Sequence, residues 1–132
     1  MQEKEILEKY RNVAIVGLSP HSDKDSYRGG NYLIEHGYNV IPVNPIELEV
    51  LGRKSYPDLI SIPEKVEVVD IFRKAEDVIP IVREAIKIGA KVVWMQLDII
   101  NEEAAKIARE AGLTVVMDKC MKKMHESLNI QS

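Results

Sequence analysis

Five short apolar segments, separated by amphipathic stretches, constrain the fold of this chain more than any other feature. They are rich in β-branched residues and almost free of polar ones, as strands are when helices cover both faces of a sheet. The segments cover residues 13–18, 40–43, 66–72, 92–97 and 113–117. This alternation predicts a doubly wound α/β fold, with a five-stranded parallel sheet inside three αβα layers.

The stretches between these segments show helical periodicity. Helices are predicted over residues 27–36, 78–88 and 102–111, each followed by a glycine that can end it. Asn101 is expected to cap the third of these helices. Two flanking helices are expected near residues 3–10 and 121–128. The length of 132 residues predicts one domain for the whole chain, 1–132.

Composition excludes several classes of function. The net charge of -3 gives no general attraction to nucleic acid or to an anionic membrane, and no apolar run approaches the roughly 20 residues of a membrane span. The charged N-terminus lacks the apolar core of a signal peptide. One cysteine cannot form an internal disulfide, and three scattered histidines form no metal motif. We therefore expect a cytoplasmic protein without a metal, while a protein partner or a homo-oligomer remains open.

The loop after the first predicted strand resembles a dinucleotide loop only in part. The strand leads into Gly17, but Ser19 replaces the second glycine of the G-x-G-x-x-G motif and a polar stretch delays the helix. Ser26 is expected to cap that helix, whose free N–H groups would form an anion site. Arg28 falls in the first turn, where a cation opposes the helix dipole, so a bound phosphate or a solvated surface position would explain it.

The end of the second predicted strand argues against NAD. NAD sites usually carry a carboxylate there to bind the ribose, whereas this strand ends at Asn44 and Pro45. Such a corner can wrap an adenine or a ribose, and it can equally be a rigid turn.

The ends of the remaining strands supply further candidates. Phe72 can pack in the core or contact a ligand, and Arg73 can bind phosphate or form a surface ion pair. Gln96 needs hydrogen-bond partners, which a ligand amide or a backbone carbonyl would provide. Cys120 can be a structural thiol, or it can form a mixed disulfide with a thiol ligand. No Ser/His/Asp set, Cys/His set or Walker motif is readable in the sequence.

A series of motifs follows in order along roughly residues 13–120. They are Val16-Gly17-Leu18-Ser19-Pro20, Ser26-Tyr27-Arg28, Gly37-Tyr38-Asn39-Val40-Ile41-Pro42-Val43-Asn44-Pro45, Leu51-Gly52, Val69-Asp70-Ile71-Phe72-Arg73, Val93-Trp94-Met95-Gln96-Leu97, Asn101-Glu102-Glu103-Ala104-Ala105 and Val116-Met117-Asp118-Lys119-Cys120. Taken together, these motifs resemble the small CoA-binding proteins of the CoA-binding-domain superfamily. The same Rossmann-like fold forms the nucleotide-binding domain of succinyl-CoA synthetase α subunits.

This resemblance implies binding of coenzyme A through its adenine nucleotide half. It places the phosphates at the first loop and Arg28, the adenosine at Asn44 and Pro45, and the pantetheine arm near Trp94 and Gln96. The expected cofactor-binding residues are Gly17, Leu18, Ser19, Ser26, Arg28, Val43, Asn44, Pro45, Phe72, Arg73, Trp94, Gln96 and Cys120.

The sequence favours a binding module over an enzyme, because the predicted fold has no second domain to bring a substrate against the cofactor. The expected role is a non-catalytic carrier, sensor or accessory module for CoA or acyl-CoA. The alternatives are a small NAD(P)-linked oxidoreductase and the nucleotide-binding subunit of a split acyl-CoA synthetase.

Overall fold

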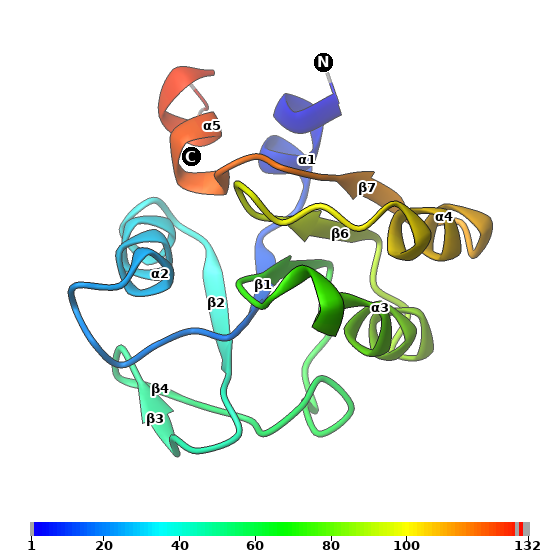
Figure 1. Ribbon diagram of the computed structural model, residues 1–132. Helices are drawn as coiled ribbons and strands as arrows, with labels where there is room; N and C mark the ends of the chain where they lie inside the picture. The colour runs from blue at the N-terminus through cyan, green and yellow to red at the C-terminus, as the bar shows by residue number, and fades with distance from the viewer. Residues whose placement is uncertain (1, 129, 131–132) are drawn as a thin grey trace.

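A five-stranded parallel sheet forms the centre of the computed structural model, which describes residues 2–128 and 130 (Figure 1). Its strand order is β2-β1-β5-β6-β7, which confirms the predicted doubly wound, Rossmann-like arrangement. The strands are β1 (Asn12–Val16), β2 (Asn39–Val43), β5 (Val68–Ile71), β6 (Val92–Met95) and β7 (Thr114–Val116).

Helices cover both faces of this sheet, as the apolar strands predict. One face carries α3 (Val78–Lys87) and α4 (Glu102–Glu110), with the short 3-10 helix η1 (Ala75–Asp77) leading into α3. The other face carries α1 (Gln2–Lys9), α2 (Asp25–Glu35) and α5 (Met121–Ser127). The predicted cap of α4 is confirmed, because the side chain of Asn101 accepts a hydrogen bond from the amide of Ala104 at 2.9 Å.

Each face of the sheet has its own apolar core, and alternate residues of the strands point into one or the other. Val69 and Val93 point to α3 and α4, where small residues of α4 such as Ala104 let the helix lie close to the sheet. Ile15 and Trp94 point to the opposite layer of α1, α2 and α5. No helix in the described part of the chain is both long and apolar enough to cross a membrane.

A small hairpin, which the sequence reading missed, follows β2. Strands β3 (Glu49–Val50) and β4 (Arg53–Lys54) pair antiparallel around Leu51 and Gly52. Both turn residues have positive φ, 54° and 72°. Two-residue hairpin turns of this kind match the twist of the strands that they join.

The strand order reverses between β1 and β5, since the chain moves from β1 to β2 on one side and later returns to the other. Ligands of doubly wound sheets bind at this reversal, beyond the carboxyl ends of the strands.

Candidate functional site

Predicted site residues from four strands meet at the carboxyl edge of the sheet. Val16 at the end of β1 pairs with Val43 on one side and with Ile71 on the other, and Ile71 pairs with Met95. The strand ends are therefore level with one another. The residues that follow them are Gly17, Asn44, Phe72 and Gln96.

Gly17 lies at the strand-order reversal, against the end of β5. Its φ is 90°, and a Cβ built there would collide with the carbonyl oxygen of Phe72 and approach Cδ of Arg73 to 3.0 Å. Only glycine adopts this backbone without strain and leaves that space free. The tight exit from β1 was predicted. The closeness of the Phe72 carbonyl, directly after β5, is a second reason why this position requires glycine.

Hydrogen bonds within the loop between β1 and α2 hold it in shape. The amide of Ser19 donates to Oγ of Ser26 at 3.0 Å, and the amide of His21 donates to Oγ of Ser19 at 3.1 Å. The prediction that Ser26 caps α2 is wrong, because the helix begins at Asp25, two residues earlier than predicted, and its N-cap is Lys24, which makes no side-chain capping bond. The Ser26 hydroxyl accepts from the loop instead of from the helix.

Arg28 lies in the first turn of α2, as predicted, and has partners within the chain. Its guanidinium donates to the carbonyl of Asp23 at 2.8 Å and forms an ion pair with Asp25 at 2.6 Å. About half of its side chain is exposed. An exposed ion pair of this kind contributes little to stability, so a phosphate can replace the carboxylate at small cost.

Asn44 braces the corner after β2. Its Nδ2 donates to the carbonyl of Leu18 at 3.1 Å, and its Oδ1 accepts from the amides of Ile46 and Glu47 at 2.9 and 3.2 Å. The side chain thus links the corner to the first loop. Leu18 is fully buried, and its carbonyl already accepts from Asn44, so this residue supports the loop and presents no surface to a ligand.

A smaller cavity of about 190 Å³ opens beside this corner, between β2 and α3. The predicted site residues that line it are Gly17, Val43, Pro45 and Arg73. Arg73 is exposed and has no hydrogen bond or ion pair with the described residues. Its charge is therefore open to an anionic group.

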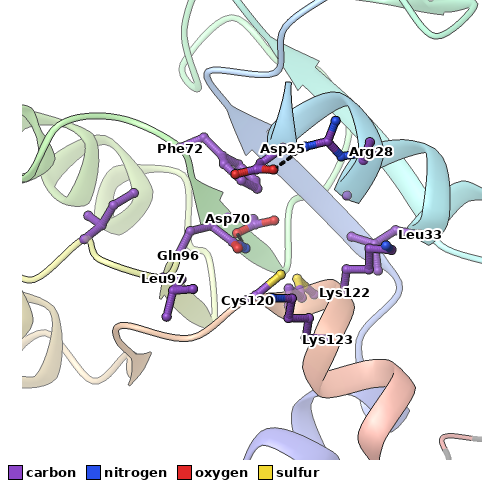
Figure 2. Close-up of a pocket in the computed structure, with 13 residues that line it drawn as sticks. Asp25, Arg28, Leu33, Asp70, Phe72, Gln96, Leu97, Cys120, Lys122 and Lys123 are labelled. Carbon is purple, nitrogen blue, oxygen red and sulfur yellow. Dashed lines mark hydrogen bonds and ion pairs between the residues drawn. The ribbon is translucent and has the colours of Figure 1, made fainter. Parts of the chain in front are cut away.

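A larger cavity of about 360 Å³ lies on the other side of Gly17, between α2, the ends of β5 and β6, and the start of α5 (Figure 2). The predicted site residues that line it are Arg28, Phe72, Gln96 and Cys120. Leu33, Ile99 and Met121 add apolar surface. Eight of the thirteen predicted residues thus line one of the two hollows. Those that line neither are Leu18, Ser19, Ser26, Asn44 and Trp94.

Asp70, which the sequence reading did not select, forms the floor of the larger cavity with Gln96. The two side chains are 1% and 4% exposed, and Nε2 of Gln96 donates a hydrogen bond to Oδ1 of Asp70. Burial raises the pKa of Asp70 to about 7, while the hydrogen bond from Gln96 acts in the opposite direction. The sequence does contain a signal for this site, because Asp70 is the single charged residue within the otherwise apolar strand Val68–Ile71.

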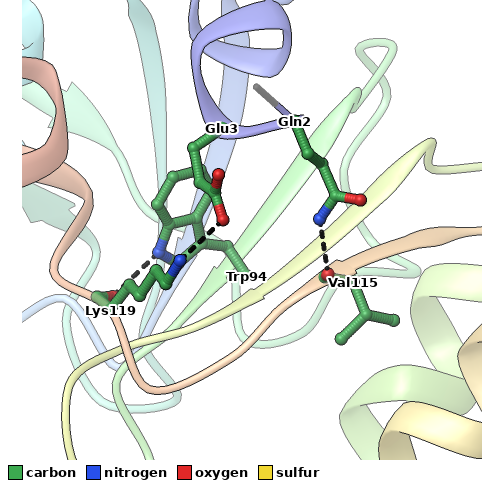
Figure 3. A network of polar contacts seen from close by, with 5 residues as sticks. All are labelled: Gln2, Glu3, Trp94, Val115 and Lys119. Carbon is green, nitrogen blue, oxygen red and sulfur yellow. Dashed lines mark hydrogen bonds and ion pairs between the residues drawn. The ribbon is translucent and has the colours of Figure 1, made fainter. Parts of the chain in front are cut away.

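Trp94 does not line either of these cavities. It is fully buried among α1, α2 and α5, and its indole Nε1 donates to the carbonyl of Lys119 at 2.9 Å (Figure 3). Lys119 in turn forms an ion pair with Glu3 of α1 at 2.9 Å, which holds the pKa of Glu3 below its usual value. Trp94 points toward the same layer as Gln96, but α1 and the segment before α5 cover it.

Cys120 is a partly exposed free thiol on the wall of the larger cavity. None of the histidines in the described part of the chain lines that cavity. Among the described residues no three His, Cys, Asp or Glu side chains are placed to hold a metal ion.

Comparison with known families identifies the class of this protein. A sequence profile described as a CoA binding domain matches residues 11–126, which include both cavities and all of the strands. The chain belongs to the CoA-binding domain family. The uncharacterized protein YneT of Bacillus subtilis (strain 168) is 38% identical over 122 residues, covering 92% of this chain and 90% of YneT.

Solved structures support the same assignment. A hypothetical protein from Pyrococcus horikoshii OT3 is 50% identical, with a TM-score of 0.95 over 97% of this chain and 90% of that one. The apo form of a dinucleotide-forming acetyl-coenzyme A synthetase 1 from Ca. Korarchaeum cryptofilum is 26% identical, with a TM-score of 0.76. That match covers 86% of this chain and 27% of the synthetase chain. The CoA-binding domain fold therefore occurs both in short chains and within a larger enzyme.

Proposed function

We propose that this protein binds coenzyme A or an acyl-CoA across the carboxyl ends of β1, β2, β5 and β6. The observation that carries the proposal is the family match over residues 11–126. The two cavities on either side of Gly17 support it, because an elongated nucleotide needs adjoining hollows at the strand-order reversal.

The smaller cavity beside Asn44 and Pro45 suits the adenosine, and the first loop between the cavities suits the phosphates. Arg73 and Arg28 lie on the two sides of that loop. Guanidinium groups match phosphate oxygens in a bidentate manner, so both are assigned to the phosphates. The larger cavity remains for the pantetheine arm.

We assign a non-catalytic role, as carrier, sensor or accessory module. The larger cavity offers a thiol and the carboxyls of Asp25 and Asp70, but none of the described histidines lines it to activate a nucleophile. A second candidate is the nucleotide-binding subunit of a split acyl-CoA synthetase, which the likeness to one part of the korarchaeal enzyme favours. An NAD-linked oxidoreductase is disfavoured, because β2 ends at Asn44 and Pro45 rather than at a carboxylate. An NADP-linked enzyme is the remaining alternative of that class.

Calorimetric titration with CoA, 3′-dephospho-CoA, NAD and NADP tests the proposal. We expect CoA to bind most tightly, and removal of its 3′-phosphate to weaken binding, because a phosphate contact with an arginine is lost. Binding of NADP without binding of CoA would overturn the assignment.

Arginine variants locate the phosphates. Arg28→Ala and Arg73→Ala are each expected to weaken CoA binding by about 1–3 kcal/mol, the usual contribution of a charged hydrogen bond. Arg109→Ala, in the last turn of α4, is the matched control and should leave the affinity unchanged. Equal affinities of all three variants would exclude the arginine sites.

A further inference from the structure

The fold alone does not explain the Asp70–Gln96 pair at the floor of the larger cavity. The other residues of β5 and β6 are apolar and buried. A buried carboxyl destabilises a protein unless its partners compensate, and a pair of apolar side chains would serve the sheet better. A polar pair kept at such a place is typical of a binding site.

Two of the four polar side-chain atoms of this pair make no hydrogen bond with the described residues. Oδ1 of Asp70 accepts from Gln96, whereas Oδ2 of Asp70 and Oε1 of Gln96 have no partner there. Both side chains line the cavity. When Asp70 is protonated, the pair offers one O–H donor and one carbonyl acceptor to a molecule inside it.

We propose that Asp70 and Gln96 recognise the amide groups of the pantetheine arm. Asp70 donates to an amide carbonyl, and the side-chain carbonyl of Gln96 accepts from an amide N–H. Pantetheine carries two successive amides and so supplies both groups. This inference rests on the proposed function and adds which residues select the arm.

The volume and the lining of the cavity suit such an arm. Its volume of about 360 Å³ lies at the small end of ligand pockets, which span roughly 300–1,000 Å³. Phe72, Leu33 and Ile99 provide apolar walls for the methylene groups between the amides. Cys120 lies on the wall beside Asp70 and Gln96 (Figure 2), where the thiol end of the arm would lie.

Binding of the arm should depend on pH, because Asp70 must be protonated to act as an O–H donor. Burial raises the pKa of Asp70 to about 7, so the donor is present below that pH and is lost above it. Two elements contribute the other charged or titratable groups that line the cavity. They are Asp25 and Arg28 of α2, and Cys120, Lys122 and Lys123 at the start of α5.

The experiment compares CoA with adenosine 3′,5′-bisphosphate, which carries the adenosine and two of the three phosphates of CoA but no pantetheine arm. Asp70→Leu is expected to weaken CoA binding about tenfold, the effect of one lost hydrogen bond, and to leave bisphosphate binding within about twofold. Retained bisphosphate binding also shows that the variant is folded. In Asp70→Asn the amide replaces the O–H donor, so the affinity for CoA is partly kept.

A pH series provides the second measurement. The ratio of the CoA affinity of the wild type to that of Asp70→Asn is expected to fall several-fold from about pH 6 to about pH 8, because only the wild type loses a proton from Asp70. Both proteins bind the same ligand, so the comparison removes the titration of the ligand's phosphates.

The outcomes distinguish the amide assignment from CoA binding itself. If Asp70→Leu weakens the binding of both ligands equally or of neither, or if the ratio of CoA affinities between wild type and Asp70→Asn does not change with pH, the amide assignment is overturned and CoA binding stands. If neither ligand binds to the wild-type protein, the proposed function fails and this inference fails with it.

Discussion

At the scale of single residues, the constraint on Gly17 has two separable causes. Its positive φ disfavours any side chain, and the carbonyl of Phe72 occupies the space that a Cβ would need. Gly52 has a positive φ of 72° as well, but a Cβ there would meet nothing within 4 Å. The two glycines therefore allow the backbone cost and the steric cost to be measured separately.

Gly52→Ala is expected to lower the free energy of unfolding by about 1–2 kcal/mol, the cost of left-handed backbone for a residue with a Cβ. Gly17→Ala should cost clearly more, because β1 and β5 must also move apart. Urea unfolding of both variants gives the comparison. Equal losses would show that the contact with Phe72 relaxes without cost.

Other single residues show what the sequence could and could not predict. The sequence predicts which residues lie at the carboxyl edge of the sheet, because each directly follows an apolar strand. These are Gly17, Asn44, Phe72 and Gln96. Ser26 was misassigned as a helix cap, since the folded loop provides a competing donor in Ser19. The burial of Trp94 was not predictable, because α1 and the segment before α5, which cover it, lie far from it in the sequence.

At the scale of elements, helix α5 forms one wall of the larger cavity and is attached to α2 through His125. The imidazole Nδ1 lies 2.8 Å from the hydroxyl of Tyr32, and its ring lies 5.1 Å from that of His36. His125 is buried, and its Nε2 has no hydrogen-bond partner among the residues that the structure describes. Burial, together with the nearby His36 and Arg11, lowers the pKa of His125.

A lowered histidine pKa stabilises the fold above the ordinary value of 6.5, and this stability is lost as the pH falls below it through the folded value. His125→Phe keeps an aromatic ring but cannot take up a proton. We expect it to remove part of the acid-induced loss in urea unfolding between about pH 7 and pH 5. His21→Ala, at an exposed loop position, is the control. If His125→Phe loses as much unfolding free energy on acidification as the wild type does, His125 is not the source of that loss.

The hairpin β3–β4 shows the limit of pattern reading at this scale. The long strands were predicted because helices on both faces leave them uniformly apolar. The strands of the hairpin contain two residues each, too few to show any alternation. Only the turn residues Leu51 and Gly52 mark the hairpin, and leucine is an unusual choice for a positive φ.

At the scale of the whole molecule, two buried groups give the stability opposite pH dependences. The raised pKa of Asp70 means that its contribution is fully present below about 3.8 and is lost as the pH rises through about 7. The contribution of His125 is lost in the other direction, as the pH falls below 6.5. In mildly acidic solution the two effects oppose each other.

Asp70→Asn is expected to remove the pH-dependent contribution of Asp70 to stability and to leave that of His125. The unfolding free energy of the variant should fall more steeply than that of the wild type as the pH is lowered from about 6.5, with a difference in slope of up to roughly 1.4 kcal/mol per pH unit for one proton. Chemical unfolding across this range measures the slopes. Parallel curves for the two proteins would show that Asp70 is ionised in the folded state.

The contact between Trp94 and Lys119 gives the protein a built-in optical probe. Trp94 is the single tryptophan of the chain, and its indole donates to the residue just before Cys120. Its intrinsic fluorescence therefore comes from one site beneath the rim of the larger cavity. Any ligand that shifts this rim will change the emission without an attached label, so that binding rates at the cavity become accessible to stopped-flow measurement on the unmodified protein.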